Sequence, residues 1–181
     1  MKRVTRRGKQ VLDILHVLTS VGWIGVGLCQ LALNVIGLLT DDPHLRHAVH
    51  AIAHLLDRWL LIALALGSLT TGTLLGLKTR WGLISYWWVI AKIALSAGLL
   101  VFTPIWMGGW AIEATALSSD SDDAHQPAYL SVRDDLMSGS VAVVTTLVLI
   151  MVISVVKPWG RTPRGRRRQR SSPEPANRGR P

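Results

Sequence analysis

The stretch LDILHVLTSVGWIGVGLCQLALN, residues 12–34, is apolar enough to lie in lipid, yet it carries polar side chains at regular intervals. A helix needs about 20 mostly apolar residues to cross roughly 30 Å of hydrocarbon. Three more segments meet this requirement, so the expected transmembrane helices cover residues 11–39, 59–77, 83–106 and 136–156. Because backbone groups in lipid must be satisfied within the segment itself, the sequence predicts an all-α, four-transmembrane-helix bundle.

The composition also indicates a membrane protein. Hydrophobic residues make up 49% of the 181 residues and charged residues only 17%, although the formal net charge is +9. The positive charge is concentrated at the two ends, which predicts a basic N-terminus (1–10), a membrane domain (11–157) and a disordered basic C-terminal tail (158–181). A soluble nucleic-acid binder would spread such charge over a folded face, so no nucleic-acid partner is expected. The expected partners are the lipid bilayer and anionic lipids at the basic ends.

Lysine and arginine residues orient the chain, because short cytoplasmic loops retain positive charge. Both ends are basic, and the connection between the second and third segments contains Lys78 and Arg80. The other two connections are acidic, with Asp41 and Asp42 in one and Asp120 in the other. The pattern predicts cytoplasmic termini in a bacterial plasma membrane. No small-residue cleavage pattern follows the first segment, so it is expected to remain as a span and not to be removed as a signal peptide.

The polar residues of the first segment recur every three or four positions, which places them on one face of a helix. This face comprises Asp13, His16, Ser20, Trp23, Gly27, Gln30 and Asn34. Small and hydrogen-bonding residues collect at helix interfaces in membranes, so packing accounts for Ser20, Gly27, Gln30 and Asn34. A ladder of Ser68, Gly72 and Gly76 in the second segment allows close helix approach, within this chain or in a homo- or hetero-oligomer.

The ionisable residues within the segments need a further explanation, because an uncompensated charge in lipid costs several kcal/mol. Lys92 lies roughly 13 Å into the third segment at a rise of 1.5 Å per residue. It is expected to reach Asp13 or His16 in the first segment. Two interpretations stay open for Asp13, His16 and Lys92: a structural ion-pair or hydrogen-bond network, and a proton, metal or cofactor site.

A second group of histidines lies in PHLRHAVHAIAHLLDRW, residues 43–59. If this run is helical, His47, His50 and His54 form one stripe, and the spacing of His50 and His54 lets both rings reach one divalent metal. The alternative is an amphipathic helix outside the membrane that uses histidines as interfacial polar residues. The single cysteine, Cys29, excludes an intrachain disulfide and a metal cage made of cysteines.

Three blocks carry a resemblance: LHVLTSVGWIGVG, LDRWLLIALALGSLTTGTLLGL and WGLISYWWVIAKIAL. They resemble a broad group of uncharacterised, small bacterial four-helix membrane proteins. This group is distantly similar to copper-resistance D proteins and to the membrane protein that serves as a haem-linked protoporphyrinogen oxidase. The resemblance matches His16 and Lys92 to a recurring first-helix histidine and third-helix lysine, and it implies haem or metal chemistry. The third segment contains no histidine, so paired haem ligation from the first and third helices is not available.

Two classes of function follow from these observations. The first is a non-catalytic membrane component that assembles with partners or passes a small solute. The second is a redox membrane protein that binds haem or a divalent transition metal, with His16 as axial ligand and with Asp13 and Lys92 tuning charge or contacting propionates. The sequence contains no hydrolase, nucleotide-binding or thiol motif, so a conventional enzyme is not expected. We favour the first class.

Overall fold

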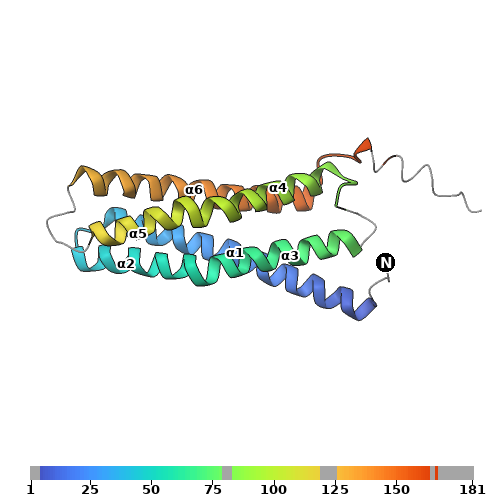
Figure 1. Ribbon diagram of the computed structural model, residues 1–181, viewed down its shortest axis with the longest axis horizontal. Helices are drawn as coiled ribbons and strands as arrows, with labels where there is room; N and C mark the ends of the chain where they lie inside the picture. Colours follow the sequence, from blue (N-terminus) through green and yellow to red (C-terminus); the bar gives the residue numbers. More distant parts are fainter. Residues whose placement is uncertain (1–4, 79–82, 119–125, 164–165, 167–181) are drawn as a thin grey trace, which may run out of the picture.

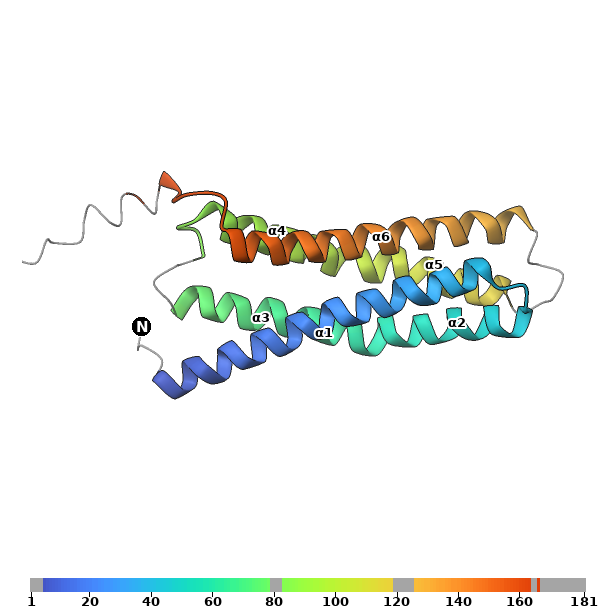
Figure 2. The ribbon, with the colours of Figure 1, turned by 180° about the vertical axis from the view of Figure 1, so that it is seen from behind.

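Four helical rods run side by side in the computed structural model, which describes residues 5–78, 83–118, 126–163 and 166 (Figures 1 and 2). The elements are α1 (Arg6–Leu39); α2 (Pro43–Leu55), η1 (Leu56–Leu61) and α3 (Ile62–Lys78); α4 (Trp87–Phe102), η2 (Thr103–Met107) and α5 (Gly108–Leu117); and α6 (Pro127–Val156). The two η segments are π-helical and continue the rods in which they lie. All four rods are long and apolar enough to cross a membrane, which confirms the predicted four-helix, all-α class.

Local sequence sets the helix ends. The Thr5 hydroxyl accepts a hydrogen bond from the Gly8 amide at the start of α1, and the Asp42 carboxylate accepts one from the His44 amide at the start of α2. These side chains satisfy amide groups that a first turn leaves without partners. Helix α6 ends where Lys157 adopts a left-handed conformation, with φ 50°.

The rods extend beyond the predicted spans. The 34 residues of α1 correspond to about 51 Å of helix, well over the roughly 30 Å of hydrocarbon. Exposed Trp59 lies beside Arg58, whose guanidinium is 5.9 Å from the indole ring centre, a pair typical of a membrane interface. About 30 Å of helix separates Trp59 from Lys78. We therefore expect the hydrocarbon to begin near Trp59 and the α2–α5 end to project beyond it.

Helix α3 packs against α1 through small residues. A Cβ atom added to Gly67 would lie 2.9 Å from Thr19 Cγ2, and one added to Gly72 would lie 2.9 Å from His16 Cε1. The hydroxyls of Ser20 and Ser68 are hydrogen-bonded at 2.7 Å. The predicted small-residue ladder thus contacts α1 of the same chain, and oligomerisation through such faces stays a prediction.

The first residues after α6 pair with the segment before α4. The Thr162 amide donates to the Ser85 carbonyl at 3.0 Å, and the Arg161 side chain donates to the Tyr86 hydroxyl at 3.0 Å. A single antiparallel bridge joins Tyr86 and Arg161. The predicted disordered tail covers residues 158–181, of which 164–165 and 167–181 lie outside the described residues, as do residues 1–4, Arg80 and Asp120.

Candidate functional site

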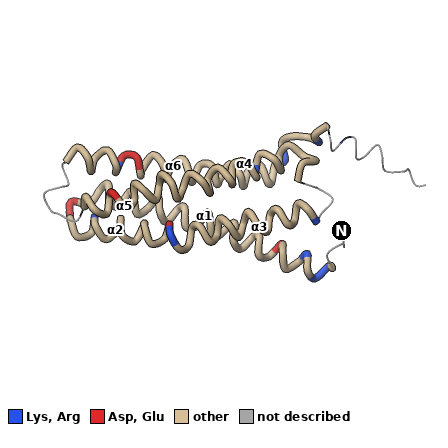
Figure 3. Tube along the Cα trace, viewed as in Figure 1, with Lys and Arg blue, Asp and Glu red and all other residues tan. Residues whose placement is uncertain are grey.

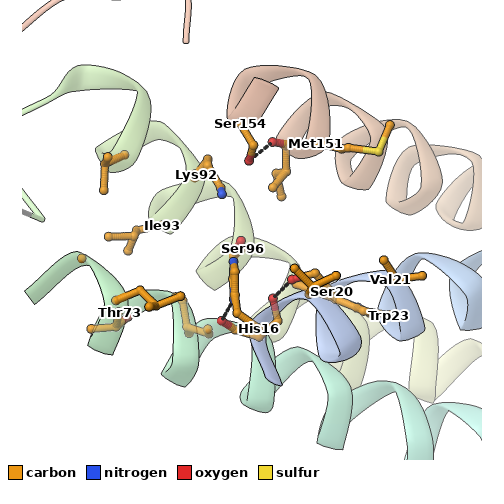
Figure 4. Close-up of a pocket in the computed structure, with 18 of the residues that line it drawn as sticks. His16, Ser20, Val21, Trp23, Thr73, Lys92, Ile93, Ser96, Met151 and Ser154 are labelled. Carbon is orange, nitrogen blue, oxygen red and sulfur yellow. Dashed lines mark hydrogen bonds between the residues drawn. The ribbon is translucent and has the colours of Figure 1, made fainter. Parts of the chain in front are cut away.

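A cavity of about 460 Å³ lies between α1, α3, α4 and α6, at the end of the bundle where α1 begins (Figure 4). Asp13, His16 and Lys92, the three residues predicted for a cofactor or charge network, all line it. Its walls are mostly apolar, with Val17, Val21, Leu69, Ile93, Leu147, Ile150 and Val155 among the lining residues. Cavities of this size hold small organic ligands and are commonly apolar with a few polar groups.

Hydrogen bonds to α3 hold the His16 ring against one wall of the cavity. Its Nδ1 lies 3.1 Å from the Ser68 carbonyl and 3.1 Å from the Thr71 hydroxyl. A carbonyl can only accept, and Thr71 already donates its proton to the Gly67 carbonyl at 2.6 Å, so His16 Nδ1 carries the hydrogen. The lone pair is then on Nε2. Metal-ligating histidines are usually oriented in this way, with one ring nitrogen donating a hydrogen bond and the other free to ligate.

Asp13 lies at the mouth of the cavity and forms an ion pair with Lys9 at 2.9 Å. Both side chains are about half exposed, so this ion pair contributes little to stability. Lys92 was predicted to contact Asp13 or His16. In the part of the chain that the structure describes, it forms no ion pair or hydrogen bond with either residue. The cavity therefore gathers the three predicted residues without joining them in one network.

Lys92 projects from α4 into the space opposite α1. Figure 4 shows Lys92 and Ser96 facing His16 and Ser20 across the cavity. Within the described ranges, the Lys92 ammonium group has no carboxylate or hydrogen-bond partner. The cavity thus presents one unused donor, the positively charged Lys92 ammonium group, within a mostly apolar wall.

The histidine stripe faces the interior of the projecting end. His50 is buried and its Nε2 lies 3.0 Å from the Tyr129 hydroxyl on α6, whereas His47 Nδ1 lies 3.3 Å from the Ser118 hydroxyl. His54 Nδ1 is buried and has no hydrogen-bond partner among the residues that the structure describes. No three His, Cys, Asp or Glu side chains among the described residues are grouped to hold a metal ion, so metal binding by the stripe stays a prediction.

A second polar interior, which the sequence did not predict, lies between η1 and η2. Gln30, Asp57, Thr103 and Ser140 line a closed cavity of about 10 Å³ together with Gly27, Leu61, Met107 and Val143. The sequence pattern predicts a packing role for Gln30 and no site at Asp57. An acidic residue within an otherwise apolar helix was the one signal that could have indicated this site.

Comparisons of the chain with protein-family models, with curated proteins and with solved structures gave no match. Function must therefore be inferred from the chemistry of the two interiors. The large cavity offers positive charge and hydrogen-bond donors. The small cavity offers oxygen atoms and one carboxylate.

Proposed function

We propose that this chain is a multi-pass, non-catalytic membrane component that binds an amphipathic anion in the large cavity. The observation that carries this proposal is the unpaired Lys92 ammonium group in a mostly apolar cavity. An ionised group removed from water is costly unless it meets an opposite charge. A carboxylate or phosphate headgroup would supply that charge, and the apolar walls would contact the rest of the ligand.

The other polar groups define the ligand further. The Ser96 hydroxyl, one turn from Lys92 on α4, adds a hydrogen-bond donor to the cavity. His16 Nε2, in contrast, presents a lone pair and suits a ligand hydroxyl or a metal ion. The best fit is therefore an acid with an apolar body. Binding of such a solute is also the first step of its passage through the bundle.

Oleate and oleyl alcohol test this proposal, because they share an apolar chain and differ in charge. We expect purified protein in a mild detergent to bind radiolabelled oleate, and Lys92→Met to weaken this binding by about 10- to 100-fold, since hydrogen bonds to charged groups contribute about 1.5–3 kcal/mol. Binding of oleyl alcohol should not change. Lys78→Met, at the exposed end of α3, is the matched control. Equal oleate binding by the two lysine variants would contradict the proposal.

Haem is the second candidate, and the fixed ring of His16 favours it. Haem is itself an amphipathic dianion; His16 Nε2 would be the axial ligand and Lys92 would bind a propionate. Bound haem would supply one-electron redox chemistry. Purified protein should then show a Soret band that His16→Ala removes and Gln30→Ala retains, because Gln30 lies about 21 Å further along α1. A colourless protein after expression with added haem would exclude this candidate.

The charge distribution supports cytoplasmic termini in a bacterial plasma membrane. Lys and Arg gather at the end where α1 begins, and most Asp and Glu lie toward the other end (Figure 3). A reporter that is active only outside the cytoplasm should work when fused after Thr40 or in the connection before α6. It should be inactive after Lys78 or Gly160. Activity at Gly160 would reverse the orientation.

A further inference from the structure

The small cavity lies where two π-helical segments meet. Segment η1 places Asp57 on the cavity, and η2 places Thr103 there. The two segments contact each other. Single π-helical turns within α-helices are rare and are frequent at functional sites. In η2 the cause is local: Pro104 has no amide hydrogen, and a π-helical turn re-satisfies the backbone groups that a proline leaves free.

Each of the four rods contributes one polar side chain to this cavity. Gln30 comes from α1, Asp57 from η1, Thr103 from η2 and Ser140 from α6. All four are buried, and even the Asp57 carboxylate residue is only 6% exposed. A buried carboxylate needs a compensating positive charge or hydrogen-bond donors. In the described part of the chain, Asp57 Oδ1 has no hydrogen-bond partner and the carboxylate forms no ion pair.

The Gln30 side chain hydrogen-bonds to the Asp57 carboxylate. Gln30 Nε2 donates to the Ala53 carbonyl at 2.9 Å, so the amide orientation is fixed and Gln30 Oε1 is left without a partner. The Ser140 hydroxyl donates its proton to the Leu136 carbonyl. It therefore accepts from Asn34 Nδ2 at 2.6 Å and keeps only acceptor capacity.

Thr103 departs from the usual behaviour of helical threonines in this protein. Four others donate to the carbonyl of the preceding turn: Thr19, Thr71, Thr115 and Thr146. The buried Thr103 Oγ1 has no hydrogen-bond partner among the described residues. Its oxygen is therefore available to the cavity. Three of the residues that line this small cavity therefore each carry an oxygen without a hydrogen-bond partner in the described part of the chain, and the fourth, Ser140, carries a hydroxyl.

We propose that this cavity binds a single monovalent cation of the size of sodium, held by oxygens of Gln30, Asp57, Thr103 and Ser140. Hard cations prefer carboxylate, carbonyl and hydroxyl oxygens. The volume of about 10 Å³ accommodates one water-sized particle, which favours sodium over the larger potassium ion. One carboxylate balances one positive charge. A water molecule alone would bring two hydrogens to four acceptors and leave the carboxylate charge uncompensated.

Occupancy of this site would link all four rods. A cation that contacts one residue from each rod binds the assembled bundle and not the unfolded chain, so it stabilises the bundle by mass action. This inference does not depend on the anion proposed for the large cavity. The two ligands have opposite charge and use no residue in common.

Thermal unfolding in sodium, potassium and choline chlorides of equal ionic strength tests the site. We expect sodium, at about 100-fold above its dissociation constant, to raise the Tm of the detergent-solubilised protein by about 5 °C over choline, with a smaller response to potassium. Radioactive ²²Na⁺ should bind with a stoichiometry of about one per chain. Asp57→Asn should abolish both responses, whereas the matched control Asp13→Asn should retain them.

A second variant keeps the test decisive if Asp57→Asn fails to fold. Thr103→Ala removes one oxygen ligand and no charge, and it should weaken ²²Na⁺ binding by at least about tenfold. A Tm that is equal in the three salts, or ²²Na⁺ binding that survives both cavity variants, would overturn the proposal. The first of these outcomes would assign the cavity to water or to a proton on Asp57.

Discussion

The lining of the large cavity includes the exposed side chains of Lys9 and Asp13, whereas every residue that lines the small cavity is buried. In the described part of the chain, the Lys92 ammonium group of the large cavity has no ion-pair or hydrogen-bond partner. Among the same residues, Gln30, Asp57 and Thr103 of the small cavity each carry an oxygen without a hydrogen-bond partner. Residues shaped only for packing would have paired with one another. This contrast is the reason that we propose an anion for the large interior and a cation for the small one.

Placing a positive charge in the small cavity should have the largest effect on stability. Asp57→Lys puts a long charged side chain into a closed space of about 10 Å³. We expect the free energy of unfolding to fall by about 4 kcal/mol or more, because the new charge is buried without a partner. Chemical denaturation in detergent measures this loss. Asp13→Lys, at the open mouth of the other cavity, should lower stability by less than about 1 kcal/mol.

Disturbing the wall that holds His16 should have an intermediate effect. Gly72→Ala brings a Cβ atom within 2.9 Å of His16 Cε1, so the ring or α3 must move. We expect a loss of about 1–3 kcal/mol, together with weaker ligand binding, because overpacking costs this much in close-packed interiors. Gly98→Ala is the control: no atom lies within 4 Å of its added Cβ, and it should be neutral or stabilising. Equal stability of the two variants would argue against the tight contact with His16.

Removing the Lys92 charge from the large cavity should increase the stability of the protein and not reduce it. Lys92→Met eliminates the cost of holding an ammonium group in an apolar wall, so the ligand-free protein should gain about 1 kcal/mol of stability. Its Tm measured without added lipid or fatty acid checks this gain. A loss of stability would show that Lys92 serves the fold and not a ligand.

Zinc binding by the histidine stripe has the smallest expected effect. A metal ion at His47, His50 and His54 must displace the hydrogen bonds to Tyr129 and Ser118. At a zinc concentration equal to the dissociation constant, the gain in stability is only about 0.4 kcal/mol. Titration calorimetry should detect weak binding that disappears when His50 and His54 are both replaced by Ala. An unchanged zinc stoichiometry in that variant would indicate that the histidines do not bind metal and serve as interfacial polar residues.

Much of the architecture could be predicted from local patterns. Hydropathy located all four rods, and the three-and-four spacing on α1 placed Asp13 and His16 on the face that lines the large cavity. The depth of Lys92 along its helix was enough to bring it to the same space. These features depend on helix geometry alone, which short-range sequence patterns report well.

The pairing of the polar groups was not predictable, because it depends on contacts between rods. Lys92 was expected to meet Asp13 or His16, but Asp13 pairs with Lys9 and His16 with Ser68. Gln30 was interpreted as packing because its neighbour Asp57 lies on another rod, in a π-helical segment that periodicity does not reveal. Helix length was underestimated because the added turns, such as residues 6–10 of α1, are more polar than the apolar segments that located the spans.

The π-helical segments also change which face of each helix points toward the interior of the bundle. A π turn contains one residue more than an α turn, which rotates everything beyond it by about 100°. In two of the rods, the set of positions that faces the interior therefore shifts by about one residue at η1 and η2. Helices α1 and α6 continue without interruption. Deleting one residue from η1 would restore an unbroken α-helix and swing α2 around its axis, carrying His50 away from Tyr129. The faces that α2 and α5 turn toward α1 and α6 are thus set separately from the faces that α3 and α4 turn toward them.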